Sequence, residues 1–178
     1  LMANETEYER YIRTTPLLQL QKTDEELVCH EELSFQIVHQ VEELWMKLAQ
    51  HELRLAIRLV DEDRFSEARM PLAKIQTICK LMSEQMRVLE LLTPVQYFTI
   101  RRALGRGSGQ ESPGFNALLE QPKGLRDALK RALERNKVEL LALHHDPSKA
   151  PELFQLTEAM VDFDAGFQNF RYQHLALV

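Results

Sequence analysis

Two histidines in aromatic surroundings are the residues of this chain best suited to chemistry. His39 follows Phe35 by one helical turn, in a stretch that is otherwise apolar or acidic, and His174 follows Phe167 and Phe170. A neutral imidazole can ligate a metal or a haem iron, and it can hydrogen-bond a bound ligand. Two such histidines on aromatic helix faces predict a buried site for something flat and apolar.

Each histidine also has a simpler interpretation. A histidine on an apolar helix face is often a core residue, and His39 lies within one turn of the carboxylates of Glu42 and Glu43. In the functional interpretation, His174 ligates a metal or haem iron and His39 hydrogen-bonds the bound ligand. The aromatic residues around His174, Tyr172 included, favour the functional interpretation because a porphyrin needs a large apolar pocket.

A carboxylate-bridged di-iron site is an alternative for a chain of long helices. Such bundles use a glutamate three residues before a histidine on facing helices. The positions three residues before the six histidines hold other residues, namely Leu27, Gln36, Leu48, Leu141, Ala142 and Arg171. The sequence therefore disfavours a di-iron site.

Two further candidates for a binding role are the cation Arg101 and a glycine-rich stretch, residues 105–114. Arg101 follows Tyr97 by one turn, and its guanidinium suits a carboxylate, with a pairing of roughly 1.5–3 kcal/mol. Residues 105–114 contain four glycines but lack the Gly-Lys-Ser/Thr ending of a phosphate-binding loop. We interpret this stretch as a connecting loop.

Almost all of the chain shows helical patterns, so helices must position these candidate residues. We expect helices over about residues 24–60, 65–92, 94–105, 124–143 and from 151 to the end. The pairs Thr23 with Glu26 and Thr93 with Pro94 are typical helix starts. The predicted fold is an all-α, single-domain bundle of long antiparallel helices around a pocket.

Composition excludes several classes of protein. The chain has 178 residues, 44% of them hydrophobic and 28% charged, which is enough for one ordinary domain with a core. A net charge of −5 argues against a nucleic-acid partner, and no apolar run is long enough to span a membrane. No signal peptide is visible and Cys29 and Cys79 show no CxxC spacing, so we expect a cytoplasmic protein.

The end of the chain lacks a helix stop signal. The apolar pattern of the last helix continues through His174 to Val178 without a glycine or a polar tail. We therefore expect the natural chain to continue beyond Val178.

Several blocks, taken together, resemble the tryptophan 2,3-dioxygenase family of haem proteins. They are Tyr8–Arg13, His30–Gln40, Glu43–Trp45, Leu92–Tyr97 with Arg101 and Leu104, Gly107–Gly109, and Phe167–His174. The blocks follow the family's order over most of the chain. The combination of Phe-x-x-x-His-Gln with Glu-Leu-Trp downstream is the most specific of them.

The resemblance implies a role for each residue near the reaction. His174 matches the ligand of a haem b iron, and His39 matches the histidine that meets the substrate's indole nitrogen. Phe35 and Tyr97 match groups beside the substrate, and Arg101 matches the clamp for its carboxylate. The implied reaction adds O2 across the indole C2–C3 bond of L-tryptophan and yields N-formylkynurenine.

Further matches imply the cofactor's surroundings and an assembly. Ser108 matches a loop serine near a haem propionate. Tyr8 and Tyr11 match tyrosines that reach into a neighbouring subunit's pocket, which implies a homo-oligomer, tetrameric in the family.

Departures from the family pattern leave other functions open. The segment between Ser108 and His174 is shorter than in long-chain dioxygenases, and Phe170 stands where tryptophan is expected. The alternative is a related haem monooxygenase or peroxygenase that acts on another aromatic amino acid or an indole. A non-catalytic helical interaction module is the third hypothesis.

Overall fold

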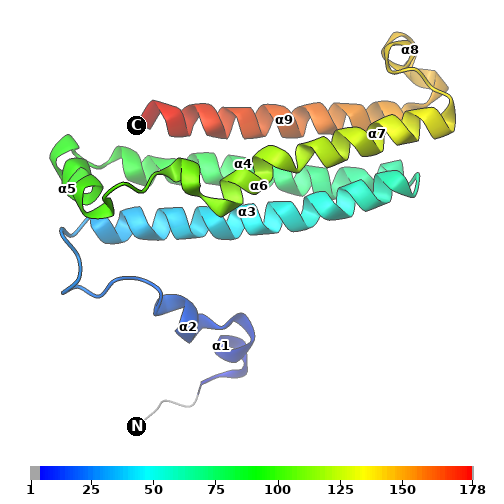
Figure 1. Cartoon of the computed structure of the whole chain (residues 1–178). Helices are drawn as coiled ribbons and strands as arrows, with labels where there is room; N and C mark the ends of the chain where they lie inside the picture. The colour runs from blue at the N-terminus through cyan, green and yellow to red at the C-terminus, as the bar shows by residue number, and fades with distance from the viewer. Residues whose placement is uncertain (1–4, 178) are drawn as a thin grey trace.

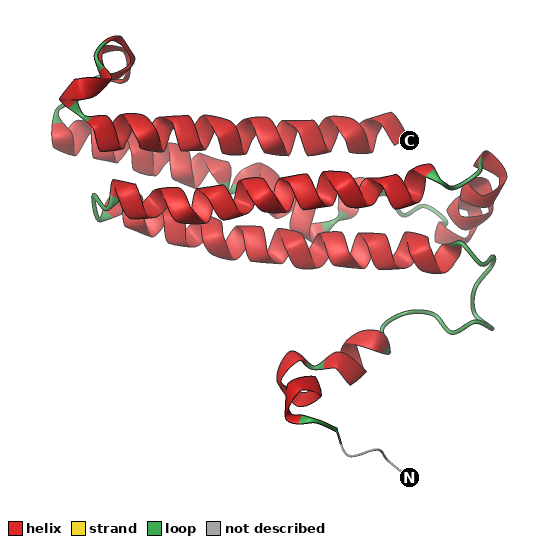
Figure 2. Cartoon of the chain, turned by 180° about the vertical axis from the view of Figure 1, so that it is seen from behind, coloured by secondary structure: helices red, strands yellow, loops and turns green. Residues whose placement is uncertain are grey.

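Four long or medium helices form the body of the molecule in a computed structural model that describes residues 5–177. They are α3 (Glu32–Asp61), α4 (Phe65–Glu90), α7 (Pro122–Asn136) and α9 (Pro151–Leu177), which lie side by side in Figures 1 and 2. Helix α3 runs antiparallel to α4, whereas α9 runs in the same direction as α4 (Figure 1). No strand occurs among residues 5–177, so the predicted all-α fold is confirmed.

Two of the shorter elements, α5 and α8, lie at the two ends of this bundle (Figure 1). Helix α5 crosses the end where α3 begins and α9 ends, while α8 lies at the opposite end (Figure 1). The shorter elements are α1 (Glu7–Ile12), α2 (Thr14–Leu18), α5 (Pro94–Leu104), η1 (Gly109–Glu111), α6 (Pro113–Glu120), α8 (Leu140–His145) and η2 (Pro147–Lys149).

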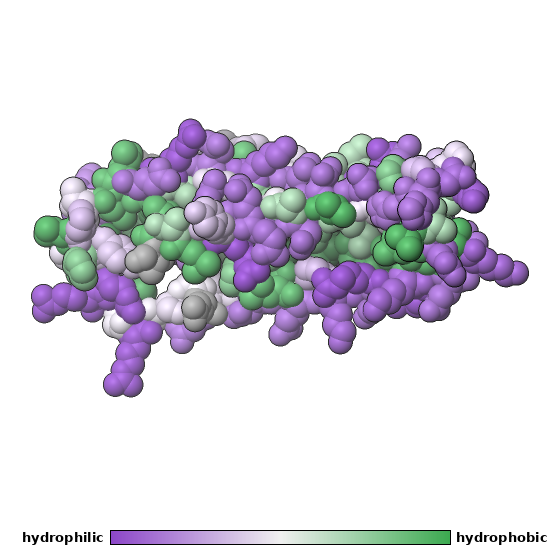
Figure 3. Space-filling model, turned by 90° about the horizontal axis from the view of Figure 1, so that it is seen from above, coloured by the Kyte–Doolittle hydropathy of each residue, from purple (hydrophilic) through white to green (hydrophobic). Residues whose placement is uncertain are grey.

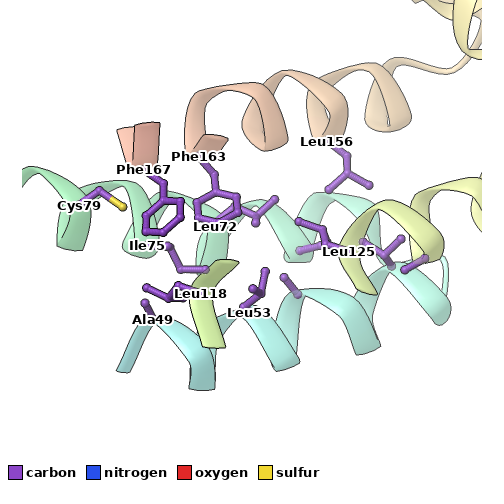
Figure 4. Packing of buried hydrophobic residues seen from close by; sticks show 14 of the residues in the cluster. Ala49, Leu53, Leu72, Ile75, Cys79, Leu118, Leu125, Leu156, Phe163 and Phe167 are labelled. Carbon is purple, nitrogen blue, oxygen red and sulfur yellow. The ribbon is translucent and has the colours of Figure 1, made fainter. Parts of the chain in front are cut away.

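The core lies between the long helices and the short α6. Leu53 from α3, Ile75 from α4, Leu118 from α6, Leu125 from α7 and Phe163 from α9 are buried in one cluster (Figure 4). Burial of apolar side chains from five helices removes their surface from water and ties these helices together. This packing fixes α3 and α9, the helices that carry His39 and His174.

Helix α3 begins eight residues later than the sequence pattern predicted. The bond from the Thr23 backbone N–H to Glu26 forms at 2.8 Å, but it closes only one turn. The backbone N–H of Val28 then donates to the Glu32 side chain at 2.8 Å instead of to a carbonyl one turn earlier. The carboxylate of Glu32 thereby interrupts the helix that was expected from residue 24.

The predicted helix over 124–143 is also wrong, because the structure divides it into α7 and α8. Lys137 adopts the left-handed conformation, with a φ of 55°. The backbone N–H of Val138 reaches back to the carbonyl of Leu133 at 3.0 Å, the pattern of a helix end closed by a left-handed residue. Val138 packs against the core and directs the chain away from the helix axis.

Helix α6 was not predicted, although its start carries the same signature as α5. Ser112 precedes Pro113, and its hydroxyl accepts the backbone N–H of Phe115 at 3.0 Å. This cap starts a helix at the end of the expected loop, and the helix contributes Leu118 to the core.

The outer face of α3 carries apolar side chains that the chain itself does not cover. Ile37, Leu44 and Leu48 are 41%, 48% and 41% exposed, and we call them the outer α3 stripe. The face seen from above, by contrast, shows apolar patches separated by hydrophilic side chains (Figure 3). None of the helices within residues 5–177 combines the length and hydropathy required to cross a bilayer.

Candidate functional site

His39 lies on α3 with one face against Phe35 and one ring nitrogen bonded to the backbone. The rings of Phe35 and His39 lie 4.2 Å apart between centroids, and Nδ1 of His39 lies 2.7 Å from the carbonyl oxygen of Phe35. Because a carbonyl oxygen only accepts, Nδ1 carries the proton in this bond. In the neutral ring Nε2 is then the hydrogen-bond acceptor.

The surroundings of His39 favour that neutral form. Burial lowers the pKa of His39, and the Phe35 carbonyl and the charge of Glu43 only partly oppose this effect. If His39 were only a core residue, we would expect it to bond a neighbouring carboxylate. Its hydrogen-bond partner in the structure is instead the backbone carbonyl of Phe35.

His174 lies in the last turn of α9, next to Phe170. The two rings are 6.4 Å apart between centroids. His39 and His174 line the same two cavities, of about 670 and 490 Å³. Burial lowers the pKa of His174, and the charge of His39 acts in the same direction. A neutral imidazole is the form that ligates a metal.

The aromatic residues around His174 divide into three environments. Phe163, Phe167 and Phe170 are all buried in the core cluster, and Phe170 also lines a cavity beside His174. Tyr172 is 72% exposed. The expectation that all these aromatics surround the histidine is therefore wrong. Phe163 and Phe167 share a face of α9 with His174 but lie two or more turns before it, and Tyr172 lies on another face.

One cavity brings together six of the eight site residues predicted from the sequence. Its volume is about 490 Å³, and α3, α4, α5, α9 and the loop after α5 contribute to its wall. The six residues are Phe35, His39, Tyr97, Arg101, Ser108 and His174. Residues separated by more than a hundred positions in the sequence thus share one cavity at the α5 end of the bundle.

Tyr97 and Arg101 owe their positions to the cap of α5. Thr93 and Gln96 form a reciprocal capping box, and Pro94 occupies the first turn. Nη1 of Arg101 donates to the carbonyl of Gly105 at 2.6 Å, which ties the guanidinium to the loop. The fork has five N–H groups in total, so this bond leaves donors for a carboxylate.

Tyr8 and Tyr11 do not reach this cavity within the chain. They lie on α1, which with α2 extends away from the bundle (Figure 1), and they are 70% and 88% exposed. Neither α1 nor α2 contains a buried residue.

Sequence reasoning missed a buried acid beside the two histidines. Glu42 is only 4% exposed and lines a second cavity of about 670 Å³ together with His39 and His174. Burial raises the pKa of Glu42 to about 7; the charge of Glu43 acts in the same direction, and the Gln85 amide opposes both. Its register with Val38 and Met46, both buried on α3, was the signal in the sequence.

The donor set and walls fit a haem better than a cluster of metal ions. No group of three or more histidine, cysteine or acidic side chains within the described residues could hold a metal ion. His174 instead offers one neutral imidazole beside apolar walls that include Phe115, Phe170 and Leu175. A single axial nitrogen and an apolar pocket are what a haem requires.

Comparisons with known proteins identify relatives over most of the chain. Residues 2–139 match the family model described as "Tryptophan 2,3-dioxygenase", a range that includes His39 and Arg101 and ends before His174. A protein named tryptophan 2,3-dioxygenase from Shewanella woodyi is 26% identical over 98% of this chain, and one from Myxococcus xanthus is 36% identical over 92%. A third, from Caulobacter vibrioides, is 32% identical over 90% of the chain.

The relatives are longer than this chain. It spans 78%, 53% and 60% of the lengths of the Shewanella, Myxococcus and Caulobacter proteins, respectively. The alignment with the Shewanella protein extends over 226 positions, so that relative has residues inside the aligned region without counterparts here.

Proposed function

Because the chain belongs to the tryptophan 2,3-dioxygenase family, we propose that it is a haem-dependent dioxygenase that adds O2 across the indole C2–C3 bond of L-tryptophan. The product of this reaction is N-formylkynurenine. The observation that carries the proposal is the single cavity shared by His39, His174 and Arg101, together with Phe35, Tyr97 and Ser108.

In this proposal His174 holds the iron of haem b through its neutral imidazole. When bound, haem supplies the oxygen chemistry, and the protein supplies binding and orientation. The lowered pKa of His174 keeps a lone pair available for the metal near neutral pH. Ser108 lines the same cavity and is proposed to lie near a haem propionate.

His39 and Arg101 are proposed to orient the substrate at its two polar ends. With Nδ1 of His39 donating to Phe35, Nε2 can accept the indole N–H. The Arg101 guanidinium pairs with the amino-acid carboxylate, and Phe35 and Tyr97 form walls beside the ring. Fixing both ends of the substrate places its C2–C3 bond in one orientation.

We also propose that the protein works as a homo-oligomer. Tyr8 and Tyr11 are exposed on a segment that extends from the bundle, as expected for side chains that enter a neighbouring subunit's pocket. The outer α3 stripe is a further apolar surface that a neighbouring copy would cover.

Product analysis tests this function. The purified chain is loaded with haem, the iron is reduced without oxygen in the presence of L-tryptophan, and oxygen is then admitted. Formation of N-formylkynurenine is the expected result, and a hydroxylated product in its place would contradict the dioxygenase reaction.

Glu42 favours one alternative, a haem monooxygenase or peroxygenase that acts on another aromatic amino acid or an indole. With hydrogen peroxide as oxidant, or with O2 and two electrons from an external reductant, one oxygen atom enters the substrate and the other leaves as water, which requires proton delivery to the leaving atom. A buried carboxyl group with a pKa of about 7 in the wall of a neighbouring cavity is a suitable proton donor. The same product analysis separates the two functions.

A further inference from the structure

The loop after α5 divides the space around His39 into three cavities. Their volumes are about 660, 670 and 490 Å³, and His39, Ser108 and Gly109 line all of them. We call residues 105–111 the glycine-rich segment. Where this segment lies therefore decides how the space between His39 and His174 is divided.

Glu43 anchors the downstream end of the glycine-rich segment to α3. Its carboxylate accepts the hydroxyl of Ser112 and, at 3.1 Å, the backbone N–H of Gly114. Ser112 in turn accepts the backbone N–H of Phe115 at 3.0 Å. Because the first turn of α6 has unpaired N–H groups and a positive dipole end, a carboxylate is a favourable acceptor there.

The anchor leaves no space for a side chain at Gly114. A Cβ atom on Gly114 would lie 2.6 Å from Oε2 of Glu43 and 2.9 Å from Cβ of Met46. The backbone of α6 thus approaches α3 as closely as a glycine permits. At the upstream end of the segment, Arg101 holds the carbonyl of Gly105.

With both ends held, the middle of the segment lies against His174. A Cβ atom on Gly109 would lie 3.2 Å from Cε1 and 3.3 Å from Nε2 of His174. These are the ring atoms on the side that a metal would approach. If His174 held a haem through Nε2, the haem would need the space that the segment occupies, and the segment would have to move away from His174.

We propose that Glu43 is a positioning residue that, through Ser112 and Gly114, holds the glycine-rich segment between His39 and His174 and so controls the entry of haem. This inference rests on the proposed function, since it takes His174 as the haem ligand. Glu43 lies one turn after His39, so the anchor is connected to the site by a single rigid helix.

The first experiment examines the anchor without haem. Glu43→Gln and Ser112→Ala weaken it from either side, Ser112→Thr restores a hydroxyl, and exposed Glu120→Gln, on the same helix, is the matched control. We expect the amides of Gly114 and Phe115 to exchange with solvent roughly ten- to hundred-fold faster in the first two variants, as for the loss of a hydrogen bond to a charged group.

Trypsin cleavage after Arg106 gives a second measure of the same motion. Arg106 is exposed within the glycine-rich segment. The Glu43→Gln and Ser112→Ala variants should be cleaved faster there, whereas Ser112→Thr and Glu120→Gln should match the unaltered protein. Unchanged exchange and unchanged cleavage in the first two variants would overturn the anchoring role.

The second experiment measures haem entry by mixing haem with each variant and following the Soret absorbance. We expect Glu43→Gln and Ser112→Ala to bind haem faster than the unaltered protein. Ser112→Thr should bind haem at the rate of the unaltered protein. Equal or slower association would overturn the control of entry. If the unaltered chain binds no haem, the proposed function fails and the control of entry fails with it, while amide exchange still reports separately whether Glu43 anchors the segment.

Discussion

Replacing Glu42 with glutamine should change how stability depends on pH. The carboxyl group has an ordinary pKa of 4.5, and burial raises the pKa of Glu42 to about 7 in the folded chain. Below pH 4.5 both the folded and the unfolded chain keep the proton, so the group does not affect folding. Between pH 4.5 and 7 the unfolded chain loses the proton while the folded chain retains it, so the free energy of unfolding falls as pH rises.

The size of this effect follows from the difference between the two pKa values. One pKa unit corresponds to about 1.4 kcal/mol, so the loss of stability amounts to about 3 kcal/mol above pH 7. Part of it has already occurred at pH 5, which leaves about 2.5 kcal/mol between pH 5 and pH 8. Glutamine has no proton to lose, so Glu42→Gln should lack this fall.

Urea denaturation followed by circular dichroism between pH 5 and pH 8 measures the difference. The matched control is Glu158→Gln, an exposed glutamate on α9 that should follow the unaltered protein at every pH. If the free energies of unfolding of the unaltered chain and Glu42→Gln stay parallel from pH 5 to pH 8, the raised pKa of Glu42 is refuted.

Three further substitutions test the site and the fold. His174→Ala should abolish the Soret band after haem reconstitution, whereas His144→Ala, which removes a histidine that also contacts a phenylalanine ring, should leave it intact; an unchanged spectrum in both would contradict ligation by His174. Arg101→Ala should weaken L-tryptophan binding by roughly ten- to hundred-fold while hardly affecting indole, as expected for a charge-assisted pair. Calorimetric titration compares the two ligands, with Arg102→Ala as control, and equal losses for both would refute the carboxylate clamp. Lys137→Gly should raise the free energy of unfolding by about 1 kcal/mol, since glycine adopts a left-handed conformation without steric cost; urea denaturation measures it, and a decrease would show that the Lys137 side chain itself stabilises the turn.

The sequence predicted helices well where local bonds determine them. Thr93 and Pro94 predicted the start of α5, and both act there as expected, with Gln96 completing a capping box. A similar pair, Thr23 and Glu26, forms only a turn because Glu32, a residue further along the chain, takes the next backbone N–H. Local signals therefore indicate where a helix can start, and competing side-chain hydrogen bonds determine whether it continues.

The buried face of α3 was harder to predict because it is not its most apolar face. Ala49, Leu53 and Ala56 are fully buried, while the larger Ile37 and Leu44 remain exposed. Close packing against α4 and α6 favours small residues, so the largest apolar side chains do not mark the buried face. Glu42 was missed because it is charged, although it lies four residues after Val38 and four before Met46, both buried.

The site residues were predicted through the resemblance to a family, and the fold places six of them in one cavity. Their assembly depends on the direction of α9, which brings His174 to the end of the bundle where α3 begins (Figure 1). Periodicity within single helices contains no information about that direction. The roles of these residues remain predictions that the substitutions above test.

Because of the outer α3 stripe, we expect the stability of the protein to depend on its concentration as well as on its sequence. If a second copy covers Ile37, Leu44 and Leu48, folding and association are linked by mass action, and the melting temperature rises with protein concentration. His39 belongs to the same helix, so conditions that separate the subunits would also loosen the helix that presents it. An assay at nanomolar enzyme and one at micromolar enzyme would then examine different populations of the same chain.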